Sequence, residues 1–296
     1  MQEATDKVRR ARRGLAIFIG VVILASAPFH TQIALYGLDA SYFLPLVWVP
    51  CFASVVARLA LREGFGDVSF RFDRRAAWAM VPALIYPVVV ALPAYGLAWG
   101  TGIAAFEPAS MHPLGFAIPG STPGERFLAG GIIALTVGPL AMAVLAVGEE
   151  IGWRGYLLPR LIDARIPHPA LVSGVVWGGW HAPMILSGHY NPSPSPMLSL
   201  LLFVVCLTGQ SYFAARLRLD TGSVWPPVVM HGGWNAIAVS FFGASTTGKH
   251  APLWASEGGV LVAGSTVLIT YVLLRWRRGQ ESAPSSRSSA LGTVRT

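Results

Sequence analysis

The chain has 296 residues, of which 53% are hydrophobic and only 12% are charged. Soluble proteins carry about a quarter charged residues, so this composition excludes an ordinary soluble fold and indicates a membrane protein. The net charge of +8 does not indicate nucleic-acid binding, because the basic residues are dispersed in short segments between apolar runs.

Eight apolar stretches are long enough to cross a bilayer. A spanning helix needs about 20 mostly apolar residues, because the hydrocarbon core is about 30 Å thick and a helix rises about 1.5 Å per residue. In chain order the predicted spans are 14–36, 41–61, 76–99, 127–149, 170–186, 197–215, 224–242 and 258–274. We therefore predict an all-α, polytopic membrane protein with eight transmembrane helices.

The basic N-terminal segment followed by an apolar run resembles a signal peptide, with a cleavage site at 25–27. We favour an uncleaved anchor, because the apolar character continues past Ala27 to Leu35. Cys51 and Cys206 each fall within an apolar run, so we expect no disulfide framework.

The distribution of Lys and Arg predicts the orientation. With the N-terminus inside, 20 of the 22 Lys and Arg residues fall on the inner side, and only Arg126 and Lys249 fall outside. This agrees with the positive-inside rule for eight spans and places both termini in the cytoplasm. We expect a single transmembrane bundle over 1–279, a disordered cytoplasmic tail over 280–296, and a bacterial plasma membrane, with the endoplasmic reticulum as the alternative.

Three polar stretches break the apolar pattern: 148–154 (GEEIGWR), 177–181 (WGGWH) and 231–235 (HGGWN). Ionisable groups inside membrane helices cost a few kcal/mol each and mark functional sites by default. Glu150 and Arg154 are spaced i,i+4, so they share a helix face and are expected to pair. Glu149 points about 100° away and is expected to face the bundle interior.

The two histidine stretches follow the same spacing. His231 and Asn235 share one helix face, and Trp177 stands beside His181 in the same way. From the basic side, His181 and His231 lie about 16 and 10 Å deep at 1.5 Å per residue. We therefore expect Glu149, His181, His231 and Asn235 to converge on one hydrated cavity in the inner half of the bilayer, facing the cytoplasm.

The less specific interpretation is packing alone. Glycines flank all three stretches, and small residues let membrane helices approach closely. The remaining histidines fall in loops or near predicted helix ends and are interpreted as incidental; they are His30, His112, His168, His189 and His250. Trp153, Trp180 and Trp234 are interpreted as packing residues.

Taken together, the three stretches resemble the CPBP family of intramembrane proteases, which includes type II CAAX prenyl endopeptidases and bacterial relatives linked to bacteriocin processing and immunity. The family pattern is EExxxR, FxxxH and HxxxN or HxxxD, and its counterparts here are the stretches that begin at Glu149, Trp177 and His231. Trp177 replaces the usual Phe, and since both are aromatic and no chemistry is expected there, this departure puts little in doubt. The resemblance covers about 127–242.

What this resemblance implies is peptide-bond hydrolysis within the membrane. Glu149 and His181 would activate a water, His231 and Asn235 would stabilise the oxyanion, and Glu150 and Arg154 would support the helix end. The implied partners are the lipid bilayer and a membrane-associated peptide or protein tail, with a lipidated substrate suggested by the CAAX relatives. No nucleic acid is expected, and the oligomeric state is not predicted.

Two versions of the mechanism stay open at this point. Glu149, His181 and His231 would make a two-histidine, one-carboxylate Zn²⁺ set, as often proposed for the family. However, the sequence has no HExxH pair to fix two ligands on one helix. We favour the metal-free version, in which glutamate activates the water.

Two other classes of function compete with a protease. Intramembrane Glu, His and Arg also form ion pathways, so a transporter is one alternative, although the chain lacks the two similar halves that many carriers show. A scaffold or immunity protein that keeps the protease fold without proteolysis is the other.

Overall fold

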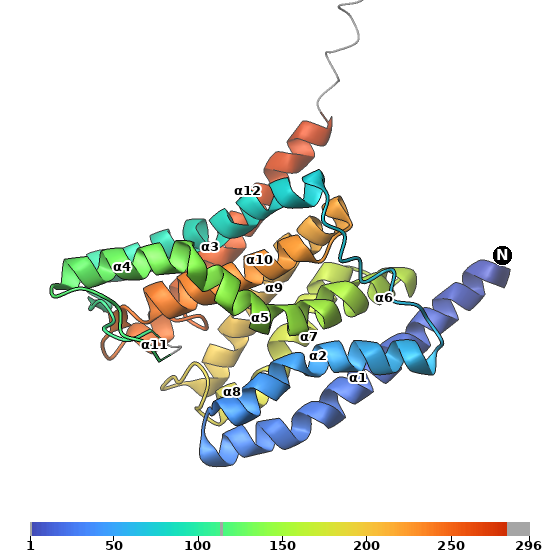
Figure 1. The fold of residues 1–296 in the computed structure, drawn as a ribbon, viewed down its shortest axis with the longest axis horizontal. Coiled ribbons are helices and arrows are strands. Elements are labelled where there is room, and N and C mark those ends of the chain that lie inside the picture. The colour runs from blue at the N-terminus through green and yellow to red at the C-terminus, as the bar shows by residue number, and fades with distance from the viewer. Residues whose placement is uncertain (1, 113–114, 283–296) are drawn as a thin grey trace, which may run out of the picture.

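The structure is a computed structural model that describes residues 2–112 and 115–282, and it is almost wholly helical (Figure 1). The long helices are α1 (Gln2–Tyr36), α2 (Ala40–Ala60), α3 (Arg74–Gly100), α9 (Pro196–Thr221) and α12 (Val260–Ser282). The shorter ones are α4 (Pro123–Leu135), α5 (Val137–Gly152), α6 (Leu158–Asp163), α7 (Pro169–Trp180), α8 (Ala182–Leu186), α10 (Trp225–Trp234) and α11 (Ala251–Trp254). Two π-helices, η1 (Trp153–Leu157) and η2 (Asn235–Gly243), and two short strands, β1 (Ala105–Phe106) and β2 (Thr246–Thr247), complete the described elements.

Each of the eight predicted spans is helical, but several are interrupted. Four described helices, α1, α2, α3 and α9, are long and apolar enough to cross a membrane, and a fifth span results if α4 and the helical run from Val137, bent by 49°, count as one. Two further interruptions fall at the polar stretches: α7 has only 12 residues and ends beside His181, and α10 passes into η2 at Asn235. The all-α membrane fold is therefore confirmed, while eight crossings stay a prediction.

Helix starts follow the expected capping chemistry. Asp39 accepts a hydrogen bond from the Ser41 N–H at the start of α2, and Asp73 does the same for Ala76 at the start of α3. Thr122 and Glu125 form a reciprocal capping box at the start of α4. These side chains satisfy backbone N–H groups that the first turn of a helix leaves unpaired.

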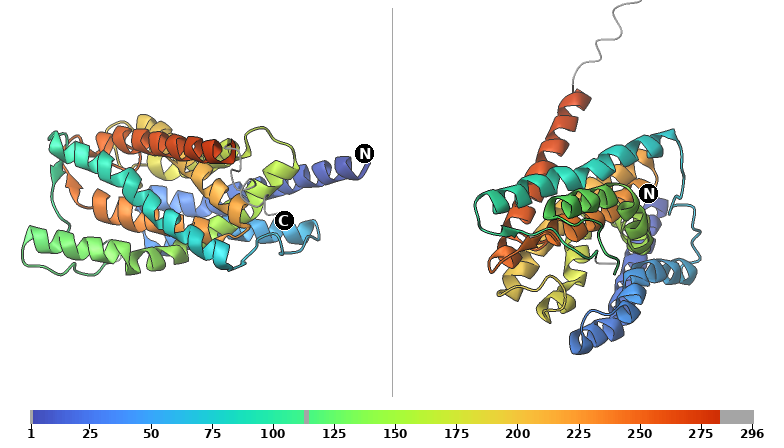
Figure 2. Two further views of the ribbon diagram at one scale, coloured as in Figure 1. Left: turned by 90° about the horizontal axis from the view of Figure 1, so that it is seen from above. Right: turned by 60° about the vertical axis from the view of Figure 1, so that its left-hand side comes forward.

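Glycines set the closest helix contacts. A Cβ on Gly152 would lie 2.6 Å from the backbone carbon of Pro50, so α5 packs directly on α2. Gly178 brings α7 close to Val204 of α9, where a Cβ would lie 2.9 Å from the Val204 Cα, and Gly232 brings α10 against the Pro139 carbonyl of α5. The tight bundle expected from the glycine-rich motifs is present (Figure 2).

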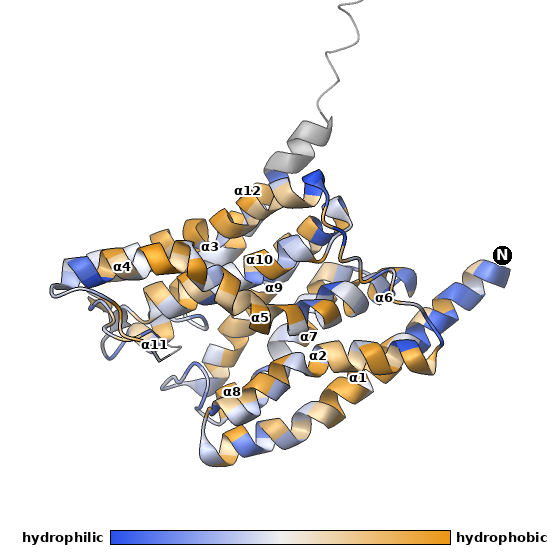
Figure 3. Ribbon diagram, viewed as in Figure 1, coloured by the Kyte–Doolittle hydropathy of each residue, from blue (hydrophilic) through white to orange (hydrophobic). Residues whose placement is uncertain are grey.

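Apolar side chains cover the outside of the bundle. Leu24, Leu92, Leu128 and Leu140 are each more than half exposed, and apolar residues follow most helices along their length (Figure 3). Such a surface is stable in lipid rather than in water, because a soluble protein rarely exposes large contiguous apolar patches. The chain is an integral membrane protein.

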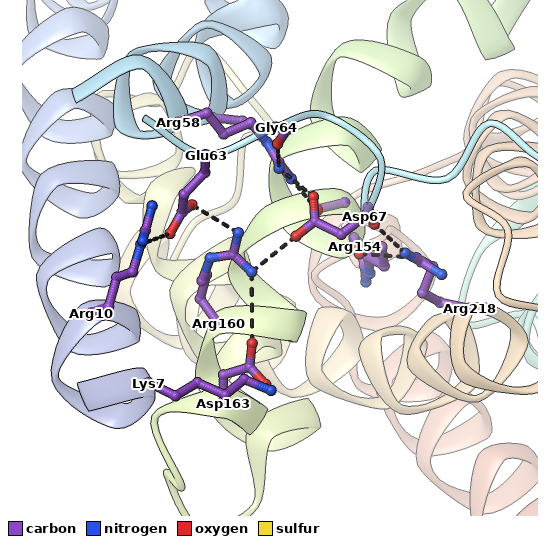
Figure 4. Close-up of polar contacts among 12 residues, drawn as sticks. Lys7, Arg10, Arg58, Glu63, Gly64, Asp67, Arg154, Arg160, Asp163 and Arg218 are labelled. Atoms are coloured by element: carbon purple, nitrogen blue, oxygen red, sulfur yellow. Dashed lines mark hydrogen bonds and ion pairs between the residues drawn. The ribbon is translucent and has the colours of Figure 1, made fainter. Parts of the chain in front are cut away.

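The ends of the helices gather into two groups. At one end, Arg10 and Arg160 both pair with Glu63 of the α2–α3 loop, and Lys7 pairs with Asp163 of α6 (Figure 4). We call this group the basic end. At the opposite end, β1 pairs with β2, and the loop after α8 contacts the loop before α12. The tail predicted from Gln280 begins within α12, and 283–296 lie outside the described residues.

Candidate active site

The first polar stretch lies where α5 gives way to the π-helix η1. A π-turn widens the helix and is frequent at functional sites, but it disturbs the regular pairing of backbone carbonyls. Two arginines from distant helices bond to carbonyls of this turn: Arg218 donates to the Arg154 carbonyl (3.2 Å), and Arg58 donates to the Gly155 carbonyl (2.9 Å). The side chains of Arg58 and Arg218 therefore stabilise this irregular turn (Figure 4).

Glu150 is the centre of a buried charge network. Its Oε1 accepts hydrogen bonds from Arg154 Nη1 (2.7 Å) and from His231 Nδ1 (3.0 Å). Both Glu150 and Arg154 are fully buried, and the Arg154 guanidinium lies 4.3 Å from the centre of the Trp177 ring. The i,i+4 spacing predicted the arginine contact, whereas the bond to His231 came from a helix 81 residues away in the chain. Glu150 thus orients a histidine as well as bracing the helix end.

Glu149 has a different set of partners. Its Oε2 accepts hydrogen bonds from two indoles, Trp177 Nε1 (2.7 Å) and Trp153 Nε1 (3.1 Å). Among the described residues, no hydrogen bond to Oε1 is present, so this oxygen is the one left for a ligand. The indoles fix the carboxylate without neutralising it, because Trp is a neutral donor.

The tryptophans interpreted as packing residues also hold polar groups. Besides Trp153, Trp180 donates to Ser26 Oγ (2.8 Å) and Trp234 donates to Glu257 Oε1 (2.6 Å). Trp177, treated as a neutral replacement for Phe, donates a bond that Phe cannot make. The sequence could have indicated these bonds, because a buried indole N–H needs a hydrogen-bond acceptor.

His181 stands at the break between α7 and α8. Its Nδ1 lies 3.0 Å from the Trp177 carbonyl, which can only accept, so Nδ1 carries the proton and Nε2 is an acceptor. His231 is fixed in the same way, since its Nδ1 faces the Glu150 carboxylate. When neutral, both imidazoles therefore offer Nε2 as a hydrogen-bond acceptor.

One cavity of about 350 Å³ is lined by Glu149, His181, His231 and Asn235. The four side chains come from α5, the α7–α8 break, α10 and η2. Apolar residues of α2 and α5 form much of the remaining wall, including Phe43, Leu44, Met142 and Leu145. The structure thus brings together every residue for which the sequence predicted a chemical role.

The cavity extends away from the basic end. Its wall includes Asp39 of the α1–α2 loop, Tyr190 of the α8–α9 loop and Glu257 of the α11–α12 loop, all at the opposite end of the bundle. This differs from the expectation of a site facing the basic, cytoplasmic side. Counting residues along a helix gives the depth of each histidine, but it does not show which loops border the cavity.

Tyr190 and Glu257 were missed at the sequence level. Tyr190 donates its hydroxyl to Glu257 Oε2 (2.9 Å), and its ring centre lies 5.7 Å from that of His181. Both residues also line a second cavity of about 260 Å³ that adjoins the first. A single acidic residue in a loop gives no pattern in the sequence, so neither residue could have been selected.

The suggested zinc ligands do not form a metal-binding group. Within the described part of the chain, no three His, Cys, Asp or Glu side chains come together in a way that could hold a metal ion. Glu149 Oε2 is engaged by two indoles and His231 Nδ1 by Glu150. These bonds leave Glu149 Oε1 and the Nε2 atoms of His181 and His231 for a ligand, so a zinc set of these three residues stays a prediction.

These features define an integral membrane protein with a Glu, His, His and Asn site within a helical bundle. Residues 131–237 match the family described as Type II CAAX prenyl endopeptidase Rce1-like, a segment that contains all three motifs. The match confirms the predicted resemblance: this segment is similar to the type II CAAX prenyl endopeptidases. No curated protein matches the chain.

Proposed function

We propose that the protein is an intramembrane endopeptidase that hydrolyses a peptide bond of a membrane-associated peptide or protein tail. The observation that carries the proposal is the shared cavity, in which side chains from four separate segments face one space. The family match over 131–237 supports peptide-bond hydrolysis as the reaction class. The roles of individual residues follow from their partners.

Glu149 is assigned as the general base. Its Oε2 is held by Trp153 and Trp177, so Oε1 is directed to take a proton from a water. His181 Nε2 accepts the second hydrogen bond of that water and orients it. The water oxygen then bonds to the peptide carbonyl carbon, and the proton held by Glu149 passes to the leaving amine as the C–N bond breaks.

Asn235 and His231 are assigned to the oxyanion. The Asn235 amide can donate to the developing negative charge without a change of protonation. His231 can donate through Nε2 only as an imidazolium, and Glu150 is placed to balance that charge. Glu150 and Arg154 therefore act as positioning residues.

This mechanism is metal-free, which extends the preference drawn from the sequence. It predicts full activity of the purified protein in strong chelator. A stoichiometric zinc ion that restores activity to chelator-treated protein would replace this version with the metal-dependent one.

The decisive test compares four variants in membranes of the host. We expect Glu149→Ala and His181→Ala to abolish cleavage while the folded protein stays in the membrane, and Glu107→Ala and His189→Ala to cleave normally, because these two side chains are exposed in loops. Comparing the membrane peptidome of these strains identifies the substrate. If Glu149→Ala still produces the same fragments as wild type, the assigned site is wrong.

We also propose that the host membrane is a bacterial plasma membrane, with both termini in the cytoplasm. The strongly basic end supports this orientation. Whether the substrate is prenylated is decided by the same peptidome, since a prenylated fragment carries the mass of the lipid. Rescue of a deletion phenotype by the Glu149→Ala variant would instead indicate a scaffold or immunity role.

A further inference from the structure

Glu257 is a second carboxylate held by aromatic donors. It lies between α11 and α12, and its two oxygens accept one bond each, from Trp234 Nε1 (2.6 Å) and from the Tyr190 hydroxyl (2.9 Å). Glu149 is held by two indoles in the same manner. Each donor pair fixes the orientation of a carboxylate and brings no positive charge to it.

Three other acids at the basic end and near the site have cationic partners. Glu150 pairs with Arg154, Glu63 pairs with Arg160 and Arg10, and Asp67 pairs with Arg58 and Arg160. Within 2–112 and 115–282, neither Lys nor Arg forms an ion pair with Glu257. Burial raises the pKa of Glu257, and the hydrogen bonds from Trp234 and Tyr190 oppose that rise. A partly buried carboxylate with these neutral donors is stabilised by a cation that arrives with a ligand.

The walls around Glu257 accept hydrogen bonds and carry negative charge. The larger cavity is lined by Asp39, Glu149 and Glu257, and no Lys or Arg is found among its described lining residues. The His181 ring, with its proton on Nδ1, adds an acceptor nitrogen. Such a wall suits a ligand rich in N–H donors.

Gln210 also places a hydrogen-bond acceptor without a partner at this cavity. This residue of α9 is fully buried and lines the larger cavity. Its Nε2 contacts Cys206 Sγ (3.4 Å), whereas its Oε1 has no hydrogen-bond partner among the described residues. An unpaired buried oxygen costs about 1–3 kcal/mol, so it is expected to meet a donor in the bound state.

We propose that Glu257, together with Gln210, forms a subsite that selects a basic side chain, Lys or Arg, in the bound peptide. The inference rests on the proposed function, since it assumes that the peptide in this cavity is the substrate. Glu257 provides the charge, Tyr190 and Trp234 hold it in place, and Gln210 accepts a further N–H bond. The subsite joins the two adjoining cavities, which together give room for residues on both sides of the basic one.

The test uses a pool of peptides with random residues at six consecutive positions. Detergent-solubilised Glu149→Gln protein, in which hydrolysis is blocked, captures peptides from the pool, and the bound fraction is sequenced. We expect Lys and Arg to be enriched about tenfold over Gln at one position, the ratio that a single buried charge contact of modest strength gives. The enrichment should disappear in Glu149→Gln/Glu257→Gln and persist in Glu149→Gln/Glu107→Gln, which removes an exposed carboxylate at the same end.

The outcomes separate this inference from the proposed function. Capture without any preference for basic residues, no capture at all, or a preference that survives Glu257→Gln overturns the subsite. Failure of wild-type protein to cleave the captured peptides counts against the protease proposal and leaves the subsite standing. A second variant, Gln210→Leu, should weaken capture of the enriched peptides several-fold, and unchanged capture would remove Gln210 from the subsite.

Discussion

Two adjacent glutamates at the end of α5 have different environments, and their partners explain why. Glu150 faces Arg154 and His231, so its charge is balanced within the protein. Glu149 faces Trp153 and Trp177, which donate hydrogen bonds but no charge. The i,i+4 spacing predicted the first pair from the sequence alone. The indole bonds could not be predicted, because the direction of a Trp ring depends on packing between helices.

The hydrogen bond from Trp177 to Glu149 can be tested by substitution. We expect Trp177→Phe to lower kcat/KM about tenfold, because Glu149 loses its shorter hydrogen bond, and one bond to a charged group is worth about 1.5–3 kcal/mol. Trp180→Phe is the matched control: it removes an indole N–H on the same helix, one that bonds to Ser26 rather than to Glu149. Equal loss of activity in both variants would show that the indole bond to Glu149 has no special role.

Hydropathy predicts where the helices of this protein lie but not where they break. All eight apolar stretches contain helix, and their approximate bounds follow from the need for about 20 apolar residues. The π-turn after Gly152 depends on Arg58 and Arg218, which lie 97 and 64 residues away from the carbonyls they bind. Local sequence cannot reveal such distant partners, so the broken helices around the site were missed.

Neighbouring glycines on α7 test the close packing of its helices. A Cβ on Gly178 would lie 2.9 Å from the Val204 Cα, whereas one on Gly179 would meet nothing within 4 Å. We expect Gly178→Ala to destabilise the protein by about 1–3 kcal/mol through overpacking. Gly179→Ala should be neutral or stabilising by up to about 1 kcal/mol, because Ala has the higher helix propensity. Thermal unfolding in detergent measures both, and equal melting temperatures would contradict the close α7–α9 contact.

The count of Lys and Arg residues predicts the orientation of the protein in the membrane. The end of the bundle toward which the cavity extends can be known only from the three-dimensional structure. At the basic end, ion pairs join α1, α6 and the α2–α3 loop (Figure 4). The cavity wall instead includes loop residues of the opposite end, among them Asp39 and Glu257. Motif spacing identified the residues with proposed chemical roles, but the segments that border the cavity are far apart in sequence. Glu257 in particular has no neighbouring motif that could have marked it.

This arrangement predicts that substrates reach the cavity from the side opposite the basic end. If the basic end is cytoplasmic, as the positive-inside rule indicates, a cysteine at Asp39 should react with a membrane-impermeant thiol reagent added outside intact cells. A cysteine at Arg12, which is exposed near the start of α1, should react only in inverted vesicles. Both substitutions, Asp39→Cys and Arg12→Cys, are made after Cys51 and Cys206 are replaced by Ala. Labelling of both positions from the same side would contradict the predicted direction of access, because the structure places them at opposite ends of α1 and its following loop.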